Sequence, residues 1–152
     1  MTKIEIMNKF YDAFSKADWK TMNSLYATDV VFEDNAFGEL DHKKVTSMWQ
    51  MLLENKESMD FSFQIIKVDG VDCVNWVTKY EFGPKRNKVT NSVIAKMEIE
   101  NDKIIYHKDE FDFKVWAKQA IGFAGKLFGG KKWFQRKIQQ AANQKLDQFM
   151  GK

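Results

Sequence analysis

The spacing of apolar residues changes near residue 60, and this change constrains the fold more than any other feature of the sequence. Before that point, apolar residues recur three and four positions apart, as they do on amphipathic helices. From Phe61 to Phe111 they alternate with polar residues, as they do on strands with one buried face. Helices followed by consecutive strands predict an α+β domain in which the helices pack on one face of the sheet.

Three helices are expected in the N-terminal part of the chain. The first covers residues 3–16 and the third covers residues 42–55. Asp18 and Asp41 predict where the second and third helices begin, because a carboxylate can cap the free N–H groups of a first helical turn. A short strand at residues 30–33 separates these two helices.

Four strands are expected next, over residues 61–65, 74–80, 89–99 and 103–111. The connections between them are short and contain turn-forming residues such as Gly70 and Pro84. Consecutive strands joined by short turns predict an antiparallel meander. Asp112 follows the last strand and predicts the start of another helix.

The C-terminal region differs from the rest of the chain in charge. Residues 114–152 contain nine Lys or Arg and one acidic residue, whereas residues 1–113 carry a net charge of −5. Glycines are expected to loosen the chain around residues 122–130, and a final amphipathic helix follows. We therefore expect an α+β domain over residues 1–122 with a basic, amphipathic helical extension over residues 123–152.

Two roles fit this basic extension. It could contact an anionic membrane surface, because Trp133 and many bases flank its apolar stripe. It could instead pack that stripe on the acidic body, or on a second copy of the chain, and close the mouth of a pocket. Nucleic acid is a less suitable partner, because no nucleic-acid-binding motif accompanies the bases.

The composition excludes several other classes of protein. The single cysteine, Cys73, excludes an intramolecular disulfide and favours a cytoplasmic location. The two histidines, His42 and His107, do not form a zinc-binding pattern, and we expect neither a metal nor another cofactor. The N-terminus lacks the apolar segment of a signal peptide, and no run approaches the ~18 apolar residues of a membrane span.

Several motifs resemble the nuclear-transport-factor-two-like superfamily, which includes SnoaL-like proteins and ketosteroid isomerases. Ala-Asp-Trp at 17–19 and Leu-Tyr-Ala-Thr-Asp-Val-Val-Phe-Glu-Asp at 25–34 resemble the family's opening. Tyr-His-Lys-Asp-Glu-Phe-Asp at 106–112 resembles the last strand of SnoaL-like proteins. Trp-Ala-Lys-Gln-Ala-Ile-Gly at 116–122 resembles the segment that follows it in some bacterial members.

This resemblance implies a cone-shaped, curved antiparallel sheet, known as a cystatin-like roll, with three N-terminal helices packed on it. It further implies a mostly apolar pocket between the helices and the sheet. Members of the superfamily commonly form homodimers through the outer face of the sheet, so a homodimer is expected here.

Of the three catalytic residues that the resemblance to ketosteroid isomerase implies, only one is matched by a residue of the same type in this sequence. The isomerase's carboxylate base falls on Asp34, but its tyrosine donor falls on Phe10 and its protonated acid falls near Ala95. A base without these hydrogen-bond donors loses the larger electrostatic contribution to catalysis, which argues against that mechanism. Tyr11 is adjacent to Phe10 but is rotated by about 100° around the helix, so it is expected to point elsewhere.

Another set of acid–base groups lies on the last strand. If Phe111 points into the pocket, then His107 and Asp109 do too, because side chains two apart share a strand face. Asp34, His107 and Asp109 are therefore the candidate catalytic residues. The candidate ligand-binding residues, taken by the same reasoning from helices and neighbouring strands, are Phe10, Phe14, Trp49, Trp76, Thr78, Tyr80, Val93, Ala95, Met97 and Phe111.

Two functions remain open from the sequence. The first is cofactor-free acid–base catalysis of the isomerase, cyclase, dehydratase or hydrolase type on a small hydrophobic molecule. Asp34 and Asp109 would then act as acid or base, and His107 would tune them or relay a proton. The second is a non-catalytic module that binds a small molecule or a protein, in which Asp34 braces a turn and His107 with Asp109 forms a satisfied buried pair.

Overall fold

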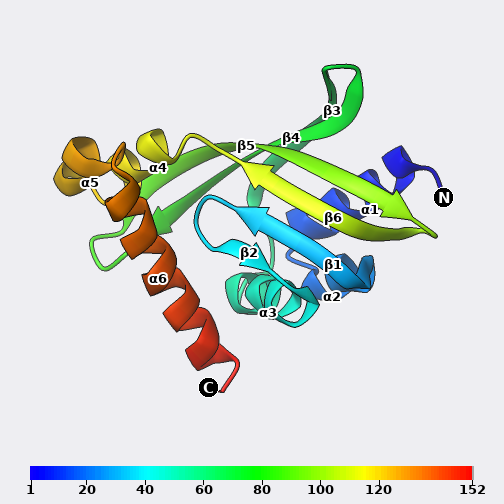
Figure 1. Ribbon diagram of the computed structural model, residues 1–152, viewed down its shortest axis with the longest axis horizontal. Coiled ribbons are helices and arrows are strands. Elements are labelled where there is room, and N and C mark those ends of the chain that lie inside the picture. The colour runs from blue at the N-terminus through cyan, green and yellow to red at the C-terminus, as the bar shows by residue number, and fades with distance from the viewer. Residues whose placement is uncertain (152) are drawn as a thin grey trace.

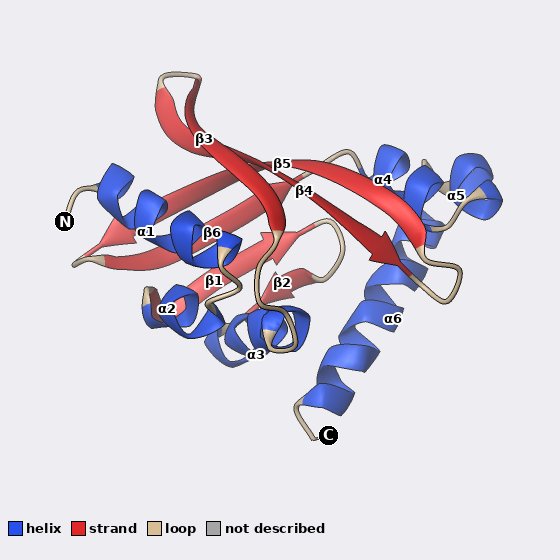
Figure 2. Cartoon of the chain, turned by 180° about the vertical axis from the view of Figure 1, so that it is seen from behind, coloured by secondary structure: helices blue, strands red, loops and turns tan. Residues whose placement is uncertain are grey.

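A computed structural model describes residues 1–151 and confirms the α+β fold (Figure 1). The elements follow one another as α1 (Lys3–Ser15), α2 (Trp19–Ser24), β1 (Tyr26–Asp34), β2 (Gly38–Leu40), α3 (His42–Leu53), β3 (Asp60–Val68), β4 (Val71–Phe82), β5 (Asn87–Glu100), β6 (Lys103–Glu110), α4 (Phe113–Ala120), α5 (Phe123–Phe128) and α6 (Lys132–Phe149). Helices α1, α2 and α3 pack on one face of a strongly twisted sheet, and α6 descends along one end of it (Figure 2).

The sheet has the strand order β2-β1-β6-β5-β4-β3. Strands β3 to β6 form the expected antiparallel meander, because each pairs with its neighbour in the sequence. The first strand is longer than the predicted residues 30–33, and it pairs in parallel with β6. The region expected to be only a turn contains β2, which pairs antiparallel with β1.

The predicted helix caps are present. The side chains of Asp18, Asp41 and Asp112 accept hydrogen bonds from backbone N–H groups of the first turns of α2, α3 and α4, at 3.1, 3.0 and 3.1 Å. Thr2 does the same for α1. Each such cap typically stabilises a protein by about 1 kcal/mol. They therefore fix where each helix begins and, with it, which side chains face the sheet.

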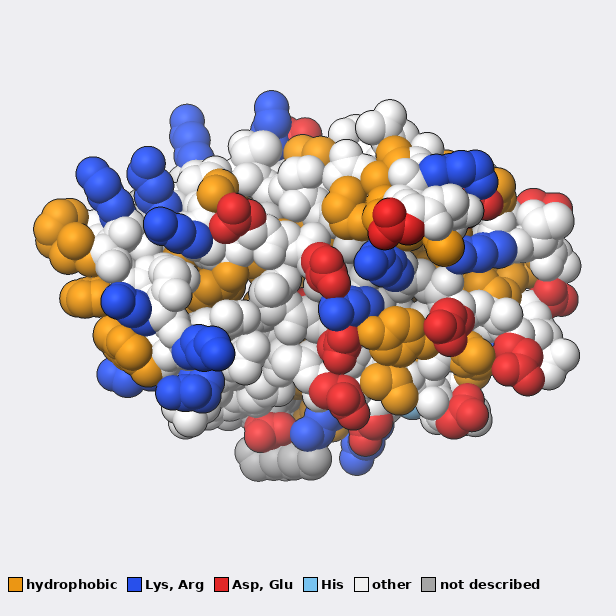
Figure 3. Space-filling view, turned by 45° about the horizontal axis from the view of Figure 1, so that its top comes forward, with side chains coloured by type: hydrophobic (Ala, Val, Ile, Leu, Met, Phe, Trp, Pro, Cys, Tyr) orange, Lys and Arg blue, Asp and Glu red, His pale blue; other side chains and the backbone are white. Residues whose placement is uncertain are grey.

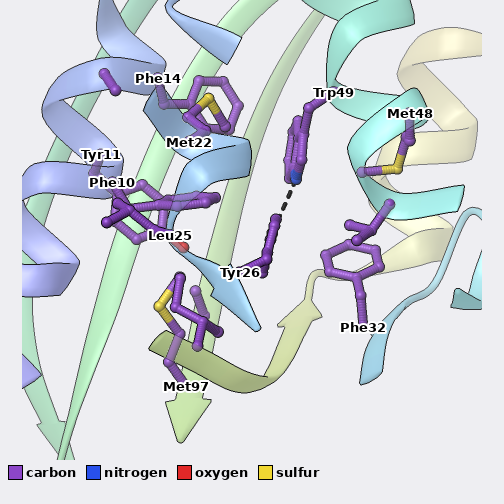
Figure 4. Close-up of a cluster of buried hydrophobic side chains, with 14 of the residues drawn as sticks. Phe10, Tyr11, Phe14, Met22, Leu25, Tyr26, Phe32, Met48, Trp49 and Met97 are labelled. Carbon is purple, nitrogen blue, oxygen red and sulfur yellow. Dashed lines mark hydrogen bonds between the residues drawn. The ribbon is translucent and has the colours of Figure 1, made fainter. Parts of the chain in front are cut away.

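The main core lies between the three N-terminal helices and the sheet and is rich in aromatic rings (Figure 4). Phe14 stacks on Phe61 with 4.6 Å between the ring centroids, and Phe10 meets Trp49 edge to face at 6.2 Å. The side chains that the sequence suggested as the lining of an apolar pocket thus pack largely against one another.

A second core lies under the C-terminal helices. It contains Val89 from β5, Phe113 and Trp116 from α4, and Phe134 from α6. The α6 helix continues along the body to α3 and buries Leu146 completely in the main core. The extension therefore packs on the body of the protein.

The expectation of a loosened chain at residues 122–130 is wrong, because most of this segment forms α5. A Cβ atom at Gly125 would lie only 1.9 Å from the backbone oxygen of Ala117 in α4. Glycine here permits close packing of two helices. None of the helices within residues 1–151 combines the length and the apolarity that crossing a bilayer requires.

Candidate acid–base site

A chain of hydrogen bonds runs through the main core and ends on a carboxylate. The indole N–H of Trp49 donates to the hydroxyl oxygen of Tyr26 at 3.0 Å, which Figure 4 shows as a dashed line. The Tyr26 oxygen lies 2.8 Å from Nδ1 of His107, and Nε2 of His107 lies 2.8 Å from Oδ1 of Asp109. His107 has no exposed surface and Asp109 has almost none.

The direction of these bonds follows from the donors available. An indole N–H can only donate, so the Tyr26 oxygen accepts from Trp49 and its own hydrogen is free to donate to Nδ1 of His107. With a neutral ring, Nδ1 then accepts from Tyr26 and Nε2 donates to Asp109. These contacts orient both the ring of His107 and the carboxyl group of Asp109.

The β6 strand places the two residues. His107 and Asp109 are two apart and share the face of the sheet that meets the helices, as the sequence predicted. His107 lies edge to face against Phe10 and Phe32, at 5.5 and 5.0 Å between centroids. Asp109 lies directly opposite Ala95 on β5. Ala95 falls near the position of the protonated acid of ketosteroid isomerase and has no carboxyl group, but Asp109, its cross-strand partner, has one.

Asp34 ends β1 and begins the turn into β2. Its Oδ1 accepts hydrogen bonds from the backbone N–H groups of Ala36 and Phe37, at 3.0 and 2.6 Å. Burial raises the pKa of Asp34 to about 7, the negative charge of Asp109 adds to the rise, and the backbone N–H groups oppose it. Asp34 therefore braces the turn and has a carboxyl group with a raised pKa.

Asp34 and Asp109 face one cavity of about 160 Å³. Its lining residues come from the ends of β1 and β6, from the β1–β2 turn, from β2 and from α6: Glu33, Asp34, Asn35, Gly38, Glu39, Lys108, Asp109, Glu110 and Gln135. His107 does not line the cavity and reaches it only through Asp109. The structure thus brings two of the three predicted catalytic residues to a common space, with the third behind them.

The α6 helix holds the β1–β2 turn beside this cavity. The side-chain amides of Gln135 and Gln139 both donate to the backbone oxygen of Asn35 at 3.1 Å. The amide of Asn143 donates to the backbone oxygen of Phe37 at 2.8 Å. Because Gln135 also lines the cavity, α6 forms part of its wall.

The residues suggested as ligand-binding lie in three settings. Phe10, Phe14, Trp49, Trp76, Val93, Ala95 and Met97 are buried in the main core. Thr78 is buried and donates to the backbone oxygen of Asp60 at 3.0 Å. Tyr80 packs on the second core, where it accepts from the indole N–H of Trp116 at 2.8 Å, and Phe111 packs against both cores. Their role in ligand binding stays a prediction.

The sequence did not predict the contacts of two tyrosines with His107. Tyr26 belongs to the quoted family motif, but the sequence does not show that its hydroxyl meets His107. The expectation that Tyr11 points elsewhere is wrong, because its hydroxyl lies 3.4 Å from Nε2 of His107. The buried face of α1 is wide enough to include both Phe10 and Tyr11. Burial raises the pKa of both tyrosines well above its ordinary value, and the charge of Asp109 adds to this rise, so both stay protonated.

Metal binding has no support from the arrangement of side chains. Within residues 1–151, His, Cys, Asp and Glu side chains form no group of three or more that could hold a metal ion.

A comparison with protein families matches residues 7–107 to the SnoaL-like domain. The chain belongs to the SnoaL-like family. The matched region begins within α1 and ends within β6; it includes Asp34 and His107, while Asp109 lies two residues beyond its end. No significant match was found among curated protein sequences.

Solved structures share the fold of this SnoaL-like protein. A ketosteroid isomerase-like protein from Catenulispora acidiphila, in complex with trimethylamine, has a TM-score of 0.62 at 12% identity and covers 78% of this chain and 94% of its own. An LEH-like epoxide hydrolase from M. tuberculosis has a TM-score of 0.60 at 19% identity and covers 82% of this chain and 93% of its own. IdmH of Streptomyces antibioticus, provisionally described as a polyketide cyclase, has a TM-score of 0.62 at 15% identity, over 78% and 98%.

Proposed function

We propose that this SnoaL-like protein is an acid–base catalyst that acts on a small molecule in the cavity between β1, β6 and α6. The observation that carries the proposal is that two carboxyl groups, Asp34 and Asp109, face one small cavity while a buried hydrogen-bond chain orients one of them. A pair of carboxyl groups in unlike environments is a common basis for dividing the roles of acid and base.

The two carboxyl groups have different roles in this proposal. Asp34 transfers the proton, because a group with a pKa of about 7 is present in both protonation states near neutral pH. Asp109 is held in place by His107 and supplies the second contact to the reacting molecule. The hydroxyl of Tyr26 and the indole of Trp49 act as positioning groups, since they touch His107 or its partner and not the cavity.

The cavity limits the substrate in size and charge. An apolar cavity of similar volume holds a molecule the size of benzene, so the cavity accepts a small molecule or the reacting end of a larger one. Five of its lining residues are acidic and one is a lysine, whose ammonium group is already paired with Glu33 and Glu110 at 3.3 and 3.0 Å. An uncharged or cationic substrate is therefore favoured over an anionic one.

The reaction class follows from the family and from the groups present. One structural neighbour is described as an epoxide hydrolase and another, provisionally, as a polyketide cyclase. Both reactions need proton transfer to or from oxygen or carbon. We therefore place the substrate among small, uncharged molecules that carry a carbonyl or an epoxide.

A panel of neutral epoxides and cyclic ketones tests this proposal. Turnover by the wild-type protein should fall by roughly 10²-fold or more in the Asp34→Asn variant, because one proton-transfer group contributes about that much. The Glu98→Gln variant is the matched control, since Glu98 is an exposed acid of β5 outside the cavity. Equal turnover by the Asp34→Asn and Glu98→Gln proteins would contradict the proposal.

A second candidate is a non-catalytic binding module of the same fold. It is favoured by the bonds that tie Asp34 to its turn and α6 to Asn35, because these give both features a structural role. Compounds that raise the melting temperature of the protein but are returned unchanged, in both the wild-type and Asp34→Asn proteins, would support it.

A further inference from the structure

Five large apolar side chains are exposed together at the end of the molecule formed by α4, α5 and the start of α6. Val115, Phe123, Leu127, Phe128 and Trp133 are 53, 75, 53, 39 and 45% exposed. Phe128 and Trp133 lie in contact, with 5.3 Å between ring centroids, so the exposed apolar surface continues across the α5–α6 connection. We call this surface the apolar end.

The α5 helix is built so that its large apolar side chains face solvent. Gly125 and Gly129 face α4, where a Cβ at Gly125 would lie 1.9 Å from the backbone oxygen of Ala117 and a Cβ at Gly129 would lie 3.2 Å from the Cβ of Ala117. Phe123 and Leu127 are each two residues from Gly125, which places them on the opposite side of the helix. A surface helix normally buries its large apolar residues. In α5 the only buried residue is Gly125, while Phe123 and Leu127 are exposed. The close glycine contacts fix this orientation.

Basic residues surround the apolar end. All of them are exposed, and they are Lys114, Lys118, Lys126, Lys131, Lys132, Arg136 and Lys137. No acidic residue occurs between Asp112 and Asp147, and among residues 1–151 none of these seven bases forms an ion pair. Figure 3 shows orange and blue side chains gathered at the left-hand end of the molecule, while red side chains gather toward the other end.

We propose that the apolar end docks on an anionic lipid bilayer. Exposed aromatic and aliphatic side chains enter the boundary between headgroups and acyl chains, and the surrounding lysines contact anionic headgroups. The apolar side chains and the lysines thus contact different layers of one bilayer. A partner that is only charged or only apolar would contact one of the two groups.

The composition of the apolar end argues against a second copy of the chain and against a nucleic acid as its partner. Two copies of the chain meeting through the same patch would bring seven bases against seven bases across a twofold axis, which is repulsive. A nucleic acid would pair with the lysines but would leave Phe123 and Leu127 without an apolar partner, because the backbone phosphates dominate such binding. An anionic bilayer supplies both negative charge and apolar volume.

Co-sedimentation of the full chain with vesicles tests the proposal. The protein should bind vesicles of phosphatidylcholine with about one-third phosphatidylglycerol at low salt, and binding should weaken in high salt because the headgroup attraction is screened. It should bind pure phosphatidylcholine vesicles much less. The Lys131→Gln/Lys132→Gln protein should lose roughly fivefold in affinity per lysine, and the Phe123→Ser/Leu127→Ser protein should also lose binding.

The control is the Lys9→Gln/Lys20→Gln protein, which removes two exposed lysines from α1 and α2, near the N-terminus. That part of the chain lies at the opposite end of the molecule from α5 (Figure 1). The control should bind like the wild type, and all variants should keep the wild-type circular dichroism, because each replaced side chain is exposed or partly exposed.

Three results would overturn the proposal. One is the absence of binding to the anionic vesicles at low salt. Another is binding that falls in the lysine variant but not in the Phe123→Ser/Leu127→Ser protein, because that pattern indicates a general polyanion contact such as nucleic acid. The third is a wild-type dimer in analytical ultracentrifugation that the Phe123→Ser/Leu127→Ser protein abolishes while vesicles are not bound, because that pattern assigns the surface to a second copy.

Discussion

His107 has no contact with solvent, yet each of its ring nitrogens has a polar partner. These two partners stabilise the fold, because a buried polar group without a partner lowers the free energy of unfolding by about 1–3 kcal/mol. Tyr26 is central to it, since its oxygen serves Trp49 on one side and His107 on the other.

Removal of the Tyr26 hydroxyl should therefore destabilise the protein. The Tyr26→Phe variant leaves both the Trp49 N–H and Nδ1 of His107 without partners, and we expect a loss of about 2–4 kcal/mol in the free energy of unfolding, measured in urea. The matched control is Tyr106→Phe, which removes a hydroxyl that donates to Glu33 near the surface and should cost less than about 1 kcal/mol. Equal costs in the two variants would contradict the importance of the buried chain.

At this scale the sequence predicts part of the site. Alternation along β6 correctly places His107 and Asp109 on one buried face, because the strand period is two. The Tyr26 and Tyr11 contacts are not predictable in this way. They depend on how β1 and α1 lie against β6, which is long-range packing that a local pattern does not contain.

At the scale of elements, α6 links the C-terminal region to both cores. Phe134 packs in the second core and Leu146 in the first, and amides between them hold the β1–β2 turn. The helix therefore stabilises the body as well as the wall of the cavity.

Truncation of one buried side chain tests this role of α6. Leu146→Ala should lower the free energy of unfolding by about 2–5 kcal/mol, because it leaves a cavity in the main core. Leu127→Ala removes the same atoms from an exposed site on α5 and should change stability by less than about 0.5 kcal/mol. A similar small change in both proteins would show that α6 does not pack on the body in solution.

Among the elements, the sequence predicts those with a strong period and misses those that depend on distant partners. The α1 and α3 helices and the β4 to β6 strands have clear patterns and clear caps or turns. The full length of β1 was missed because Thr28 and Asp29 are exposed near a register shift in the pairing with β6. The α5 helix was missed because Gly125 suggests a flexible chain, whereas here glycine serves close contact with Ala117.

For the whole molecule, the charge of Asp34 sets a dependence of stability on pH. The folded protein holds a proton on Asp34 up to a pKa of about 7, whereas the ordinary value is 3.8. Between these values the folded state binds more protons than the unfolded state, so this group makes stability fall as pH rises from about 4 to 7.

The Asp34→Asn variant should remove this dependence. It should be more stable than the wild type at pH 8, by roughly 1–3 kcal/mol, because the amide oxygen can still accept from Ala36 and Phe37 without a buried charge. The gain should shrink toward pH 4. Urea unfolding of both proteins across this range measures the difference, and parallel pH profiles would show that Asp34 is not buried as described.

The central claim is that Asp34 and Asp109 face the same cavity closely enough for the charge of one to affect the other. The most direct measurement is an NMR titration of the Asp34 carboxyl carbon in the wild-type and Asp109→Asn proteins. We predict a pKa of about 7 in the wild type and a lower value in the variant, still above 3.8 because burial remains the larger cause. An ordinary aspartate pKa in the wild type, or the same pKa in both proteins, would contradict the account.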